Sequence, residues 1–270
     1  MKKVFGVIGD PISHSLSPVM HNAAFDHLEM DCAYHAFQVK GEHLREAIVG
    51  ARYLGFGGLN VTIPHKEEVL KIVEGGKMAS DIGAANTIDF RRMKAFNTDG
   101  PGALDSLQDN GIDVSGKDVL VLGAGGAARA IVYIMAISGA RVTVLNRTED
   151  KSLALASHMS MFGNVTGKGL GEIPTDVSAS DVIINTTSVG MYPDVDGTLV
   201  TSDMLDSSQV VFDLVYKPLE TRLLKEARMA GAKTIDGITM LVRQGARSFE
   251  IWNDVRPPVD VMERSVRDVL

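Results

Sequence analysis

The chain has 270 residues, of which 45% are hydrophobic and 23% are charged, and its formal net charge is −7. This composition is typical of a globular protein of one or two domains. Because no long basic run offsets the acidic charge, we expect neither nucleic acid nor a membrane as a partner.

Cysteine and histidine usage narrows the class further. Cys32 is the only cysteine, which excludes an internal disulfide and favours a reducing, cytoplasmic location. The seven histidines show no spacing of metal ligands, so no metal site is predicted. The most apolar stretch, residues 119–145, is interrupted by glycines and by Arg129, and it does not predict a transmembrane helix.

Apolar runs rich in β-forming residues alternate with helical patterns along most of the chain. The expected strands are residues 4–8, 33–37, 58–63, 87–90, 118–122, 141–145, 181–185, 210–213 and 233–235. Helical patterns between them include residues 42–54, 127–138 and 219–230. This alternation predicts an α/β fold with a parallel sheet.

A domain boundary is expected near Gly100-Pro101-Gly102, which leads into a connecting helix. We therefore predict an N-terminal α/β substrate domain over residues 1–101 and a C-terminal Rossmann domain over residues 102–238. Residues 239–270 have the pattern of two helices separated by Pro257-Pro258. We expect these helices to pack back on the first domain, with a cleft between the two domains.

A glycine-rich turn follows the strand expected at 118–122. The turn is Gly123-Ala124-Gly125-Gly126-Ala127, and a helical pattern begins within it. Such a turn brings bare backbone close to a pyrophosphate, and the helix N-terminus presents unpaired N–H groups to it. A glycine-rich turn alone is weak evidence, but the strand before it and the helix after it supply the required context.

The next strand ends in Asn146-Arg147-Thr148, where an NAD enzyme would carry a ribose-binding acid. The guanidinium of Arg147 can pair with a 2′-phosphate. We therefore favour a role in binding NADP over the alternative that Arg147 is a solvated surface cation. Thr148 could donate to the same phosphate or cap the next helix, and Lys151 is a further nearby cation. Small polar residues at 185–191, after another strand, are suited to line the ligand crevice.

Ser15 and Ser17 follow the first strand. Ser17 precedes Pro18, which is the pattern of a helix N-cap. Ser15 has no such structural reason, and two hydroxyls near a helix N-terminus could bind a carboxylate.

Lys66 stands at the end of Asn60-Val61-Thr62-Ile63-Pro64-His65-Lys66, with Pro64 predicted as the first residue of a helix. A lysine in the first turn of a helix opposes the helix dipole. Lys66 can therefore be interpreted either as a surface lysine or as an amine placed there for proton transfer. Asp99 has the pattern of a helix N-cap, and Asn86 that of a residue closing a turn.

Together these motifs closely resemble the shikimate dehydrogenase family. The matching segments are residues 6–11, 15–18, 60–66, 83–87, 97–100, 123–129, 146–148, 185–191, 213–216, 236–237 and 244–246. They cover nearly the whole chain in order. The resemblance implies a substrate domain and an NADP-binding Rossmann domain that close over shikimate. It also implies reversible, NADPH-linked reduction of 3-dehydroshikimate to shikimate in the biosynthesis of chorismate and aromatic amino acids.

The resemblance also implies roles for individual residues. It gives the substrate carboxylate to Ser15 and Ser17, and makes Lys66 and Asp99 the catalytic pair, with Lys66 stabilising and protonating the reduced oxygen. The substrate ring and its hydroxyls would contact Asn60, Thr62, Asn86, Asp99, Tyr216 and Gln244. NADP would be held by Gly123, Ala124, Gly125, Gly126, Ala127, Asn146, Arg147, Thr148, Val215 and Gly237, with Lys151 nearby.

The chain departs from the family pattern at two cations. Lys77 stands where many members carry an acid near the nicotinamide side, and Lys151 replaces an arginine often found beside the phosphate. Three alternatives remain: an NAD-linked quinate/shikimate dehydrogenase, a non-catalytic NADP-binding relative, and an unrelated Rossmann reductase. Arg147 argues against the first, Lys66 and Asp99 against the second, and the first hundred residues against the third. Monomer and homodimer both remain open.

Overall fold

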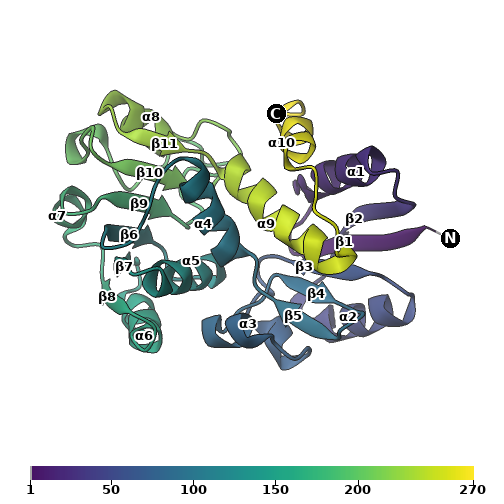
Figure 1. The fold of residues 1–270 in the computed structure, drawn as a ribbon. Helices are drawn as coiled ribbons and strands as arrows, with labels where there is room; N and C mark the ends of the chain where they lie inside the picture. The colour runs from purple at the N-terminus through teal and green to yellow at the C-terminus, as the bar shows by residue number, and fades with distance from the viewer. Residues whose placement is uncertain (1) are drawn as a thin grey trace. The chain divides into compact units, whose positions relative to one another are not determined.

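The computed structural model describes residues 2–270 of the chain, which form two compact units. Unit 1 holds the residues up to Gly102 together with Leu241–Leu270, and unit 2 holds Ala103–Met240. The α/β fold class predicted from the sequence is confirmed (Figure 1).

Unit 1 is built on a five-stranded sheet with the order β2-β1-β3-β4-β5. Its strands are β1 (Lys3–Gly9), β2 (Cys32–Gln38), β3 (Gly58–Val61), β4 (Thr87–Asp89) and β5 (Lys94–Phe96). Strand β1 pairs in parallel with β2 and β3, whereas β4 is antiparallel to both β3 and β5. The sheet is therefore mixed, and not wholly parallel as predicted.

Helices and helical turns surround this sheet. They are α1 (Ser17–His27), η1 (Gly41–His43), α2 (Leu44–Tyr53), η2 (Glu68–Lys71), α3 (Lys77–Ile82) and α10 (Val259–Arg267). Two further helices, α4 (Asp99–Asp109) and α9 (Gly237–Asn253), have residues in both units.

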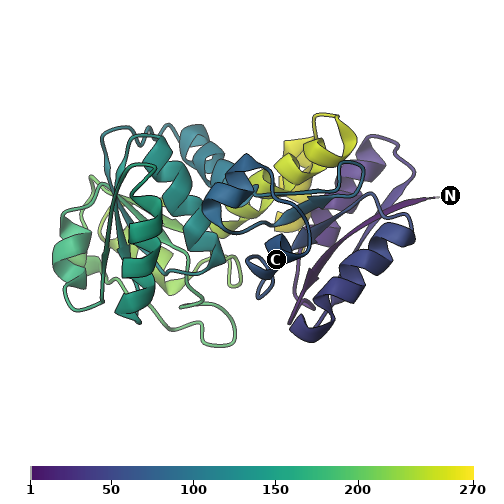
Figure 2. The ribbon, with the colours of Figure 1, turned by 90° about the horizontal axis from the view of Figure 1, so that it is seen from below.

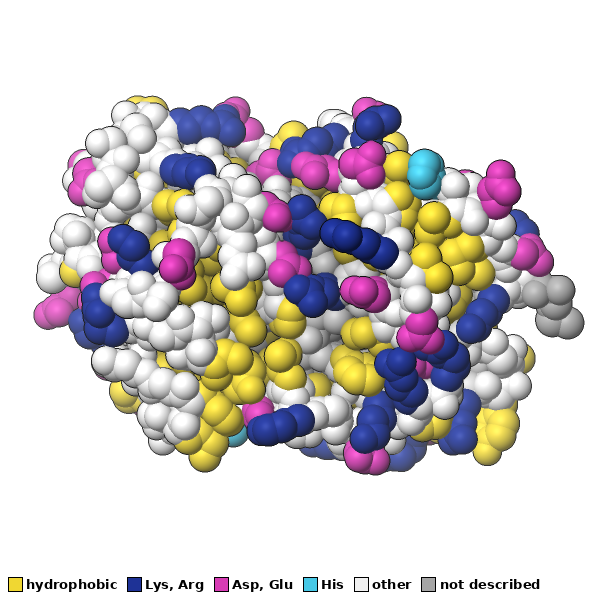
Figure 3. Space-filling view, viewed as in Figure 1, with side chains coloured by type: hydrophobic (Ala, Val, Ile, Leu, Met, Phe, Trp, Pro, Cys, Tyr) yellow, Lys and Arg dark blue, Asp and Glu magenta, His cyan; other side chains and the backbone are white. Residues whose placement is uncertain are grey.

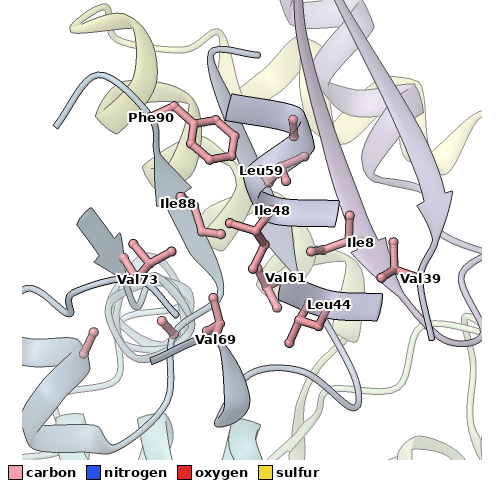
Figure 4. Close-up of a cluster of buried hydrophobic side chains, with 14 residues drawn as sticks. Ile8, Val39, Leu44, Ile48, Leu59, Val61, Val69, Val73, Ile88 and Phe90 are labelled. Atoms are coloured by element: carbon pink, nitrogen blue, oxygen red, sulfur yellow. The ribbon is translucent and has the colours of Figure 1, made fainter. Parts of the chain in front are cut away.

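The apolar face of α2 anchors one core of unit 1. Figure 4 shows Leu44 and Ile48 of α2 beside Val61 of β3, within a cluster whose members are all nearly inaccessible to water. Burial of such side chains contributes about 1.5–3 kcal/mol each, so this cluster fixes the position of β3. Strand β3 in turn carries Asn60, one of the predicted substrate contacts.

A second core of unit 1 consists of aromatic side chains. Trp252 of α9 lies 5.1 Å from Phe5 of β1, measured between ring centroids, and its Nε1 donates to the carbonyl of Ile88 at 2.9 Å. A Cβ atom at Gly58 would lie 2.1 Å from Nε1 of Trp252, so only glycine fits at this point of β3. This contact fixes α9 against the sheet of unit 1.

Unit 2 is built on a six-stranded sheet with the order β11-β10-β9-β6-β7-β8, and all pairs are parallel. Its strands are β6 (Asp118–Leu122), β7 (Arg141–Leu145), β8 (Asn164–Lys168), β9 (Val182–Asn185), β10 (Val210–Asp213) and β11 (Lys233–Ile235). Numbered within the unit, this is the order 3-2-1-4-5-6 of a dinucleotide-binding Rossmann fold. The predicted Rossmann architecture is present.

Helices cover both faces of this sheet, as Figures 1 and 2 show. They are α5 (Gly126–Ile137), α6 (Glu149–Met159), α7 (Ile173–Ser178) and α8 (Arg222–Met229), with a short helical turn η3 (Ser202–Met204). Leu120 and Leu122 of β6 pack in one cluster with residues of α7 and α8. Alternate residues of β6 point to the opposite face, where α5 contacts the strand.

Gly58→Ala is expected to lower the thermal stability of the chain. The added methyl group overlaps the buried Trp252 ring, and overpacking of this kind costs about 1–3 kcal/mol. Gly50→Ala is the matched control, because nothing lies within 4 Å of its added Cβ, and alanine in helix α2 gains about 1 kcal/mol over glycine. Thermal denaturation followed by circular dichroism should show opposite shifts; equal melting temperatures for the two variants would contradict the close approach of α9 to β3.

Candidate active site

Lys66 and Asp99 form an ion pair in unit 1. The Nζ atom of Lys66 lies 2.6 Å from Oδ2 of Asp99, and the two side chains are only 14% and 6% exposed. Partial burial weakens the screening of this charge pair by solvent and salt. The structure therefore places the two residues of the predicted catalytic pair in direct contact.

The predicted helix at Lys66 is absent. Residues 62–67 form turns, and the first helical residues after β3 are those of η2. The carbonyl of Lys66 accepts a hydrogen bond from the N–H of Ala85 at 2.7 Å, so it does not take part in a helical ladder. The helix-dipole argument for Lys66 is thus wrong, and the partner that holds this cation is the carboxylate of Asp99.

Asn97 replaces Asp99 as the residue that caps α4. Its Oδ1 accepts hydrogen bonds from the backbone N–H groups of Asp99 at 3.0 Å and Gly100 at 3.3 Å. These donors are the orphan N–H groups of a helix N-terminus. Because Asn97 satisfies them, the carboxylate of Asp99 is left to bind Lys66.

Asn86 fixes the other oxygen of Asp99. The backbone N–H of Thr98 donates to Oδ1 of Asn86 at 2.8 Å, which determines the orientation of the amide. The Nδ2 group then faces Oδ1 of Asp99 at 2.9 Å and Oε1 of Gln244 at 3.2 Å. Asn86 thus joins β4, α4 and α9 rather than merely closing a turn.

Gln244 is held by close packing of its helix. A Cβ atom at Gly102 would lie 2.7 Å from the backbone nitrogen of Gln244, and one at Gly245 would lie 2.2 Å from Cε of Met20. These two glycines allow α9 to approach α4 and α1 closely at this level. The side chain of Gln244 also donates to the carbonyl of Leu241 at 2.7 Å.

Asn60 and Ser17 are linked by a tyrosine that the sequence analysis missed. The buried hydroxyl of Tyr34 donates to Oδ1 of Asn60 at 2.7 Å. Burial raises the pKa of Tyr34 well above its usual value, although a hydrogen bond with Ser17 lowers it. Tyr34 therefore remains a neutral donor. In the sequence, the role of Tyr34 was indicated only by its position as a single tyrosine inside an apolar strand.

Ser17 does not cap helix α1. The N-cap position is Leu16, and no side chain makes the capping hydrogen bond. The backbone N–H of Ser17 instead donates to Oγ of Ser15 at 3.3 Å. The capping interpretation of Ser17 is wrong, because Ser17 already lies inside the helix. Both hydroxyls nevertheless stand at the N-terminus of α1.

Thr62 directly follows β3 and is half-buried. Its backbone N–H donates to the carbonyl of Ile8 at 2.9 Å, which fixes it beside β1. Among residues 2–270 its hydroxyl makes no hydrogen bond, so the donor remains available to a ligand.

In unit 2 the glycine-rich turn joins β6 to α5. Gly123 has a φ of 108°, and a Cβ atom there would lie 2.6 Å from Oγ1 of Thr186. Gly125 is the N-cap of α5, and a Cβ there would meet nothing within 4 Å. The turn with Ala124, Gly126 and Ala127 thus presents open backbone at the N-terminus of a twelve-residue helix.

The β7–α6 connection places its polar side chains in solvent. Arg147, Thr148 and Lys151 are exposed, and Arg147 makes no ion pair with any residue that the structure describes. Asn146 donates from Nδ2 to the carbonyl of Thr148 at 2.8 Å, which stabilises the loop. Thr148 occupies the N-cap position of α6 without a side-chain capping bond. The side chains of Arg147 and Thr148, the two candidate donors to a phosphate, are therefore available to a ligand.

Asp213 organises the carboxyl edge of the unit 2 sheet. Its carboxylate accepts hydrogen bonds from Asn185 at 2.9 Å, from Thr221 at 2.6 Å and from the N–H of Val215 at 3.0 Å. Burial raises the pKa of Asp213, and these hydrogen bonds oppose the shift. In the sequence, Asp213 stood out only as part of the motif at residues 213–216.

The loop after Asp213 carries Val215 and Tyr216. A Cβ atom at Gly237 would lie 2.6 Å from the carbonyl oxygen of Val215, so Gly237 lets the start of α9 meet this loop. Tyr216 is half-buried, and burial raises its pKa. The structure thus brings Val215 and Gly237 together within unit 2, whereas Tyr216 lies in a different unit from the other predicted substrate contacts.

A pocket of about 440 Å³ lies elsewhere in unit 1, and it contains neither Lys66 nor Asp99. Its lining includes Lys77 and Arg92, which are paired with Asp81 at 2.8 Å and with Asp254 at 3.1 Å. Two of its lining cations are thus paired with carboxylates, and we assign no ligand to the pocket. The structure gives Lys77 a partner on its own helix.

Figure 3 shows Lys and Arg side chains gathered over the part of unit 1 that holds α2 and β4, with Asp and Glu side chains among them. Arg91 and Arg92 both pair with Asp254, and Lys94 lies 3.5 Å from Glu74. These three cations are thus paired with carboxylates.

Within residues 2–270, no group of three or more His, Cys, Asp or Glu side chains is arranged to hold a metal ion. In the same part of the chain, no helix combines the length and apolar character needed to cross a membrane.

Three family models match the chain in succession. Residues 7–88 match the shikimate dehydrogenase substrate binding domain, residues 105–215 match shikimate/quinate 5-dehydrogenase, and residues 237–267 match the shikimate 5′-dehydrogenase C-terminal domain. The NADP(+)-dependent shikimate dehydrogenase of Methanocella arvoryzae is 64% identical over 270 residues, which is 100% of both chains.

Solved structures agree with the sequence matches. Shikimate 5-dehydrogenase from Thermus thermophilus, in complex with NADP(H) and shikimate, is 35% identical with a TM-score of 0.90, and the match covers 99% of this chain and 100% of that one. Quinate dehydrogenase from Corynebacterium glutamicum, in complex with NAD, is 28% identical with a TM-score of 0.91, and the match covers 99% of each chain. On these matches over the full length, the chain belongs to the shikimate dehydrogenase family.

Proposed function

We propose that this chain catalyses the reversible, NADPH-linked reduction of 3-dehydroshikimate to shikimate, a step toward chorismate and the aromatic amino acids. The observation that carries the proposal is the Lys66–Asp99 pair, with Asn86 holding the second carboxylate oxygen. Proton transfer needs an acid–base group within hydrogen-bond reach and held in place. The contact with Asp99 holds Lys66 in place for this role.

The substrate is proposed to bind in unit 1. Ser15 and Ser17 would donate their hydroxyls to its carboxylate at the N-terminus of α1, where the helix dipole also favours an anion. Asn60, Thr62, Asn86 and Gln244 would contact the ring and its hydroxyls. The open hydroxyl of Thr62 and the amide of Gln244 supply donors for this purpose.

The residues of unit 2 fit NADP. The glycine turn leaves bare backbone at the N-terminus of α5, which suits a pyrophosphate. Arg147, with no partner among residues 2–270, suits the 2′-phosphate, with Asn146, Thr148 and Lys151 beside it. Val215 and Gly237 would complete the site at the opposite end of the cofactor. NADPH bound there would supply the hydride that reduces the substrate ketone.

Lys66 is proposed to handle the proton. As the ketone oxygen gains negative charge, the Lys66 ammonium donates a hydrogen bond to it and then its proton. Asp99 remains bonded to the lysine nitrogen throughout, so the amine keeps its position until it is reprotonated. In the oxidative direction the amine accepts the proton of the substrate hydroxyl.

The location and assembly of the enzyme are also proposals. One cysteine in 270 residues suits a reducing compartment, so we propose a cytoplasmic enzyme that acts as a monomer or homodimer.

Lys66→Ala should lower kcat for shikimate oxidation by about 10²–10⁴, the usual effect of losing an acid–base group. KM should change little, because the lost interaction grows as charge develops on oxygen. Asp99→Asn should also lower kcat, and the two effects should be far from additive. Steady-state kinetics with shikimate and NADP⁺ is the measurement.

Lys71→Ala serves as the control for charge removal, because Lys71 is 70% exposed and pairs with Glu68 at 2.7 Å. It should leave kcat unchanged. A steep rise in KM with an intact kcat for Lys66→Ala would instead make Lys66 a binding residue alone.

Arg147→Ala should weaken NADP⁺ binding far more than NAD⁺ binding. A charge-assisted contact to the 2′-phosphate contributes about 1.5–3 kcal/mol, which corresponds to roughly 10- to 150-fold. Arg141→Ala is the control, since Arg141 stands at the opposite end of β7 and pairs with Asp118. Calorimetric titration with each cofactor decides the matter, and equal losses for NADP⁺ and NAD⁺ would refute the phosphate role.

A further inference from the structure

Three buried hydroxyls lie against the amides of Asn60 and Asn86. They belong to Thr87 of β4, to Thr98 just before α4 and to Ser248 of α9, and we call them the hydroxyl cluster. Each of these residues is at most 2% exposed. Ser248 Oγ lies 2.8 Å from Oγ1 of Thr87 and 3.2 Å from Oγ1 of Thr98, so it bridges the other two.

Ser248 also contacts Asn60 directly. Nδ2 of Asn60 donates to Oγ of Ser248 at 2.9 Å, which is the shortest of its hydrogen bonds. Its other acceptors are the carbonyl of Asn86 at 3.1 Å and the hydroxyl of Thr87 at 3.2 Å. Ser248 is therefore the main acceptor that faces the amide nitrogen, while Tyr34 donates to the amide oxygen from the other side.

The orientation of such an amide depends on its hydrogen bonds. The oxygen and nitrogen of an asparagine side chain have nearly the same size, so packing alone does not distinguish them. Thr98 donates to Oδ1 of Asn86 at 3.1 Å, the hydroxyl oxygen of Thr87 lies at the same distance from Oδ1, and both threonine hydroxyls also contact Ser248. One serine thus supports both amides, directly for Asn60 and through the threonines for Asn86.

Helix formation does not account for this serine. Ser248 lies inside the seventeen-residue helix α9, where alanine has the higher propensity. Its hydroxyl donates back to the carbonyl of Gln244 at 3.1 Å, a bond that adds little to a helix. The two lone pairs of its oxygen can then accept from Nδ2 of Asn60 and from the hydroxyl of Thr87, and these contacts give the residue a role at the site.

We propose that Ser248 is a positioning residue, which acts through Asn60 and the two threonines to hold both asparagine amides in the orientation that substrate binding requires. This inference rests on the proposed function, in which Asn60 and Asn86 contact the ring hydroxyls. Ser248 itself does not touch substrate. Its effect therefore falls on substrate affinity and leaves the proton-transfer pair in place, because the Thr98 N–H still fixes Asn86.

Ser248→Ala should raise both the KM and the calorimetric Kd for shikimate by about three- to tenfold, the loss expected for one net hydrogen bond. The KM for NADP⁺ should stay the same, and kcat should stay within about threefold. Thr87→Val removes the shortest partner of Ser248 at nearly constant volume and should act in the same direction. Wild-type enzyme is measured alongside.

Ser180→Ala is the matched control, because Ser180 is also buried and its hydroxyl donates to the carbonyl of Asp176 at 2.7 Å in unit 2. Both serine variants should lose some thermal stability, but only Ser248→Ala should lose shikimate affinity. Unchanged shikimate affinity in Ser248→Ala, with active wild type, overturns the positioning role alone. A wild type that neither binds nor oxidises shikimate overturns the proposed function, and the inference with it.

A double-mutant cycle tests the route of the effect. Adding Ser248→Ala to Asn60→Ala should change shikimate affinity little further, since the serine acts through the amide that is already gone. Combined with Thr62→Val, which removes a hydroxyl that shares no hydrogen bond with Asn60 or Ser248 among residues 2–270, its effect should be additive. Additive losses in both combinations would overturn action through Asn60.

Discussion

Shielding a charged lysine and a charged aspartate from water costs free energy, because both charges lose hydration. The attraction between the two charges offsets this cost only when they lie in close contact. Lys66 and Asp99 meet at 2.6 Å, and Asn86 binds the carboxylate oxygen that the lysine leaves free. A buried ion pair contributes little net stability, so a role in catalysis explains the Lys66–Asp99 pair better than a role in folding. The hydrogen bonds of Asn97 and the turns at residues 62–67 all serve to keep this pair in place.

The second constraint is the close approach of backbones at glycine. Gly58 admits the indole of Trp252, and Gly102 admits the backbone of α9 at Gln244. Helix α9 is thereby fixed against the sheet of unit 1 and against α4, so that the side chains of Gln244 and Ser248 reach the asparagine amides. In unit 2, Gly237 likewise lets the backbone at the start of α9 approach the loop of Val215 closely.

Sequence patterns predicted each described strand except β5 and β8, where the signal is weak. β8 (Asn164–Lys168) is polar and half-exposed, and β5 (Lys94–Phe96) contains no β-branched residue, so neither was expected. Lys66 was placed on a helix because Pro64 often starts one, whereas the chain there uses turns, with the carbonyl of Lys66 bonded to Ala85. Family resemblance gave the site residues, but Tyr34 and Ser248 were missed. Ser248 lies 188 positions from Asn60 in the chain, and such contacts leave no local pattern.

The proposed chemistry requires that Lys66, held by Asp99, exchanges a proton with the oxygen that is oxidised or reduced. A crystal structure of the enzyme with shikimate and NADP⁺ would reveal this contact. Nζ of Lys66 should lie within about 3 Å of the reacting C3 oxygen of shikimate while it keeps its contact with Asp99. A complex in which the C3 oxygen is bound by other side chains, with Lys66 bonded to Asp99 alone, would contradict it.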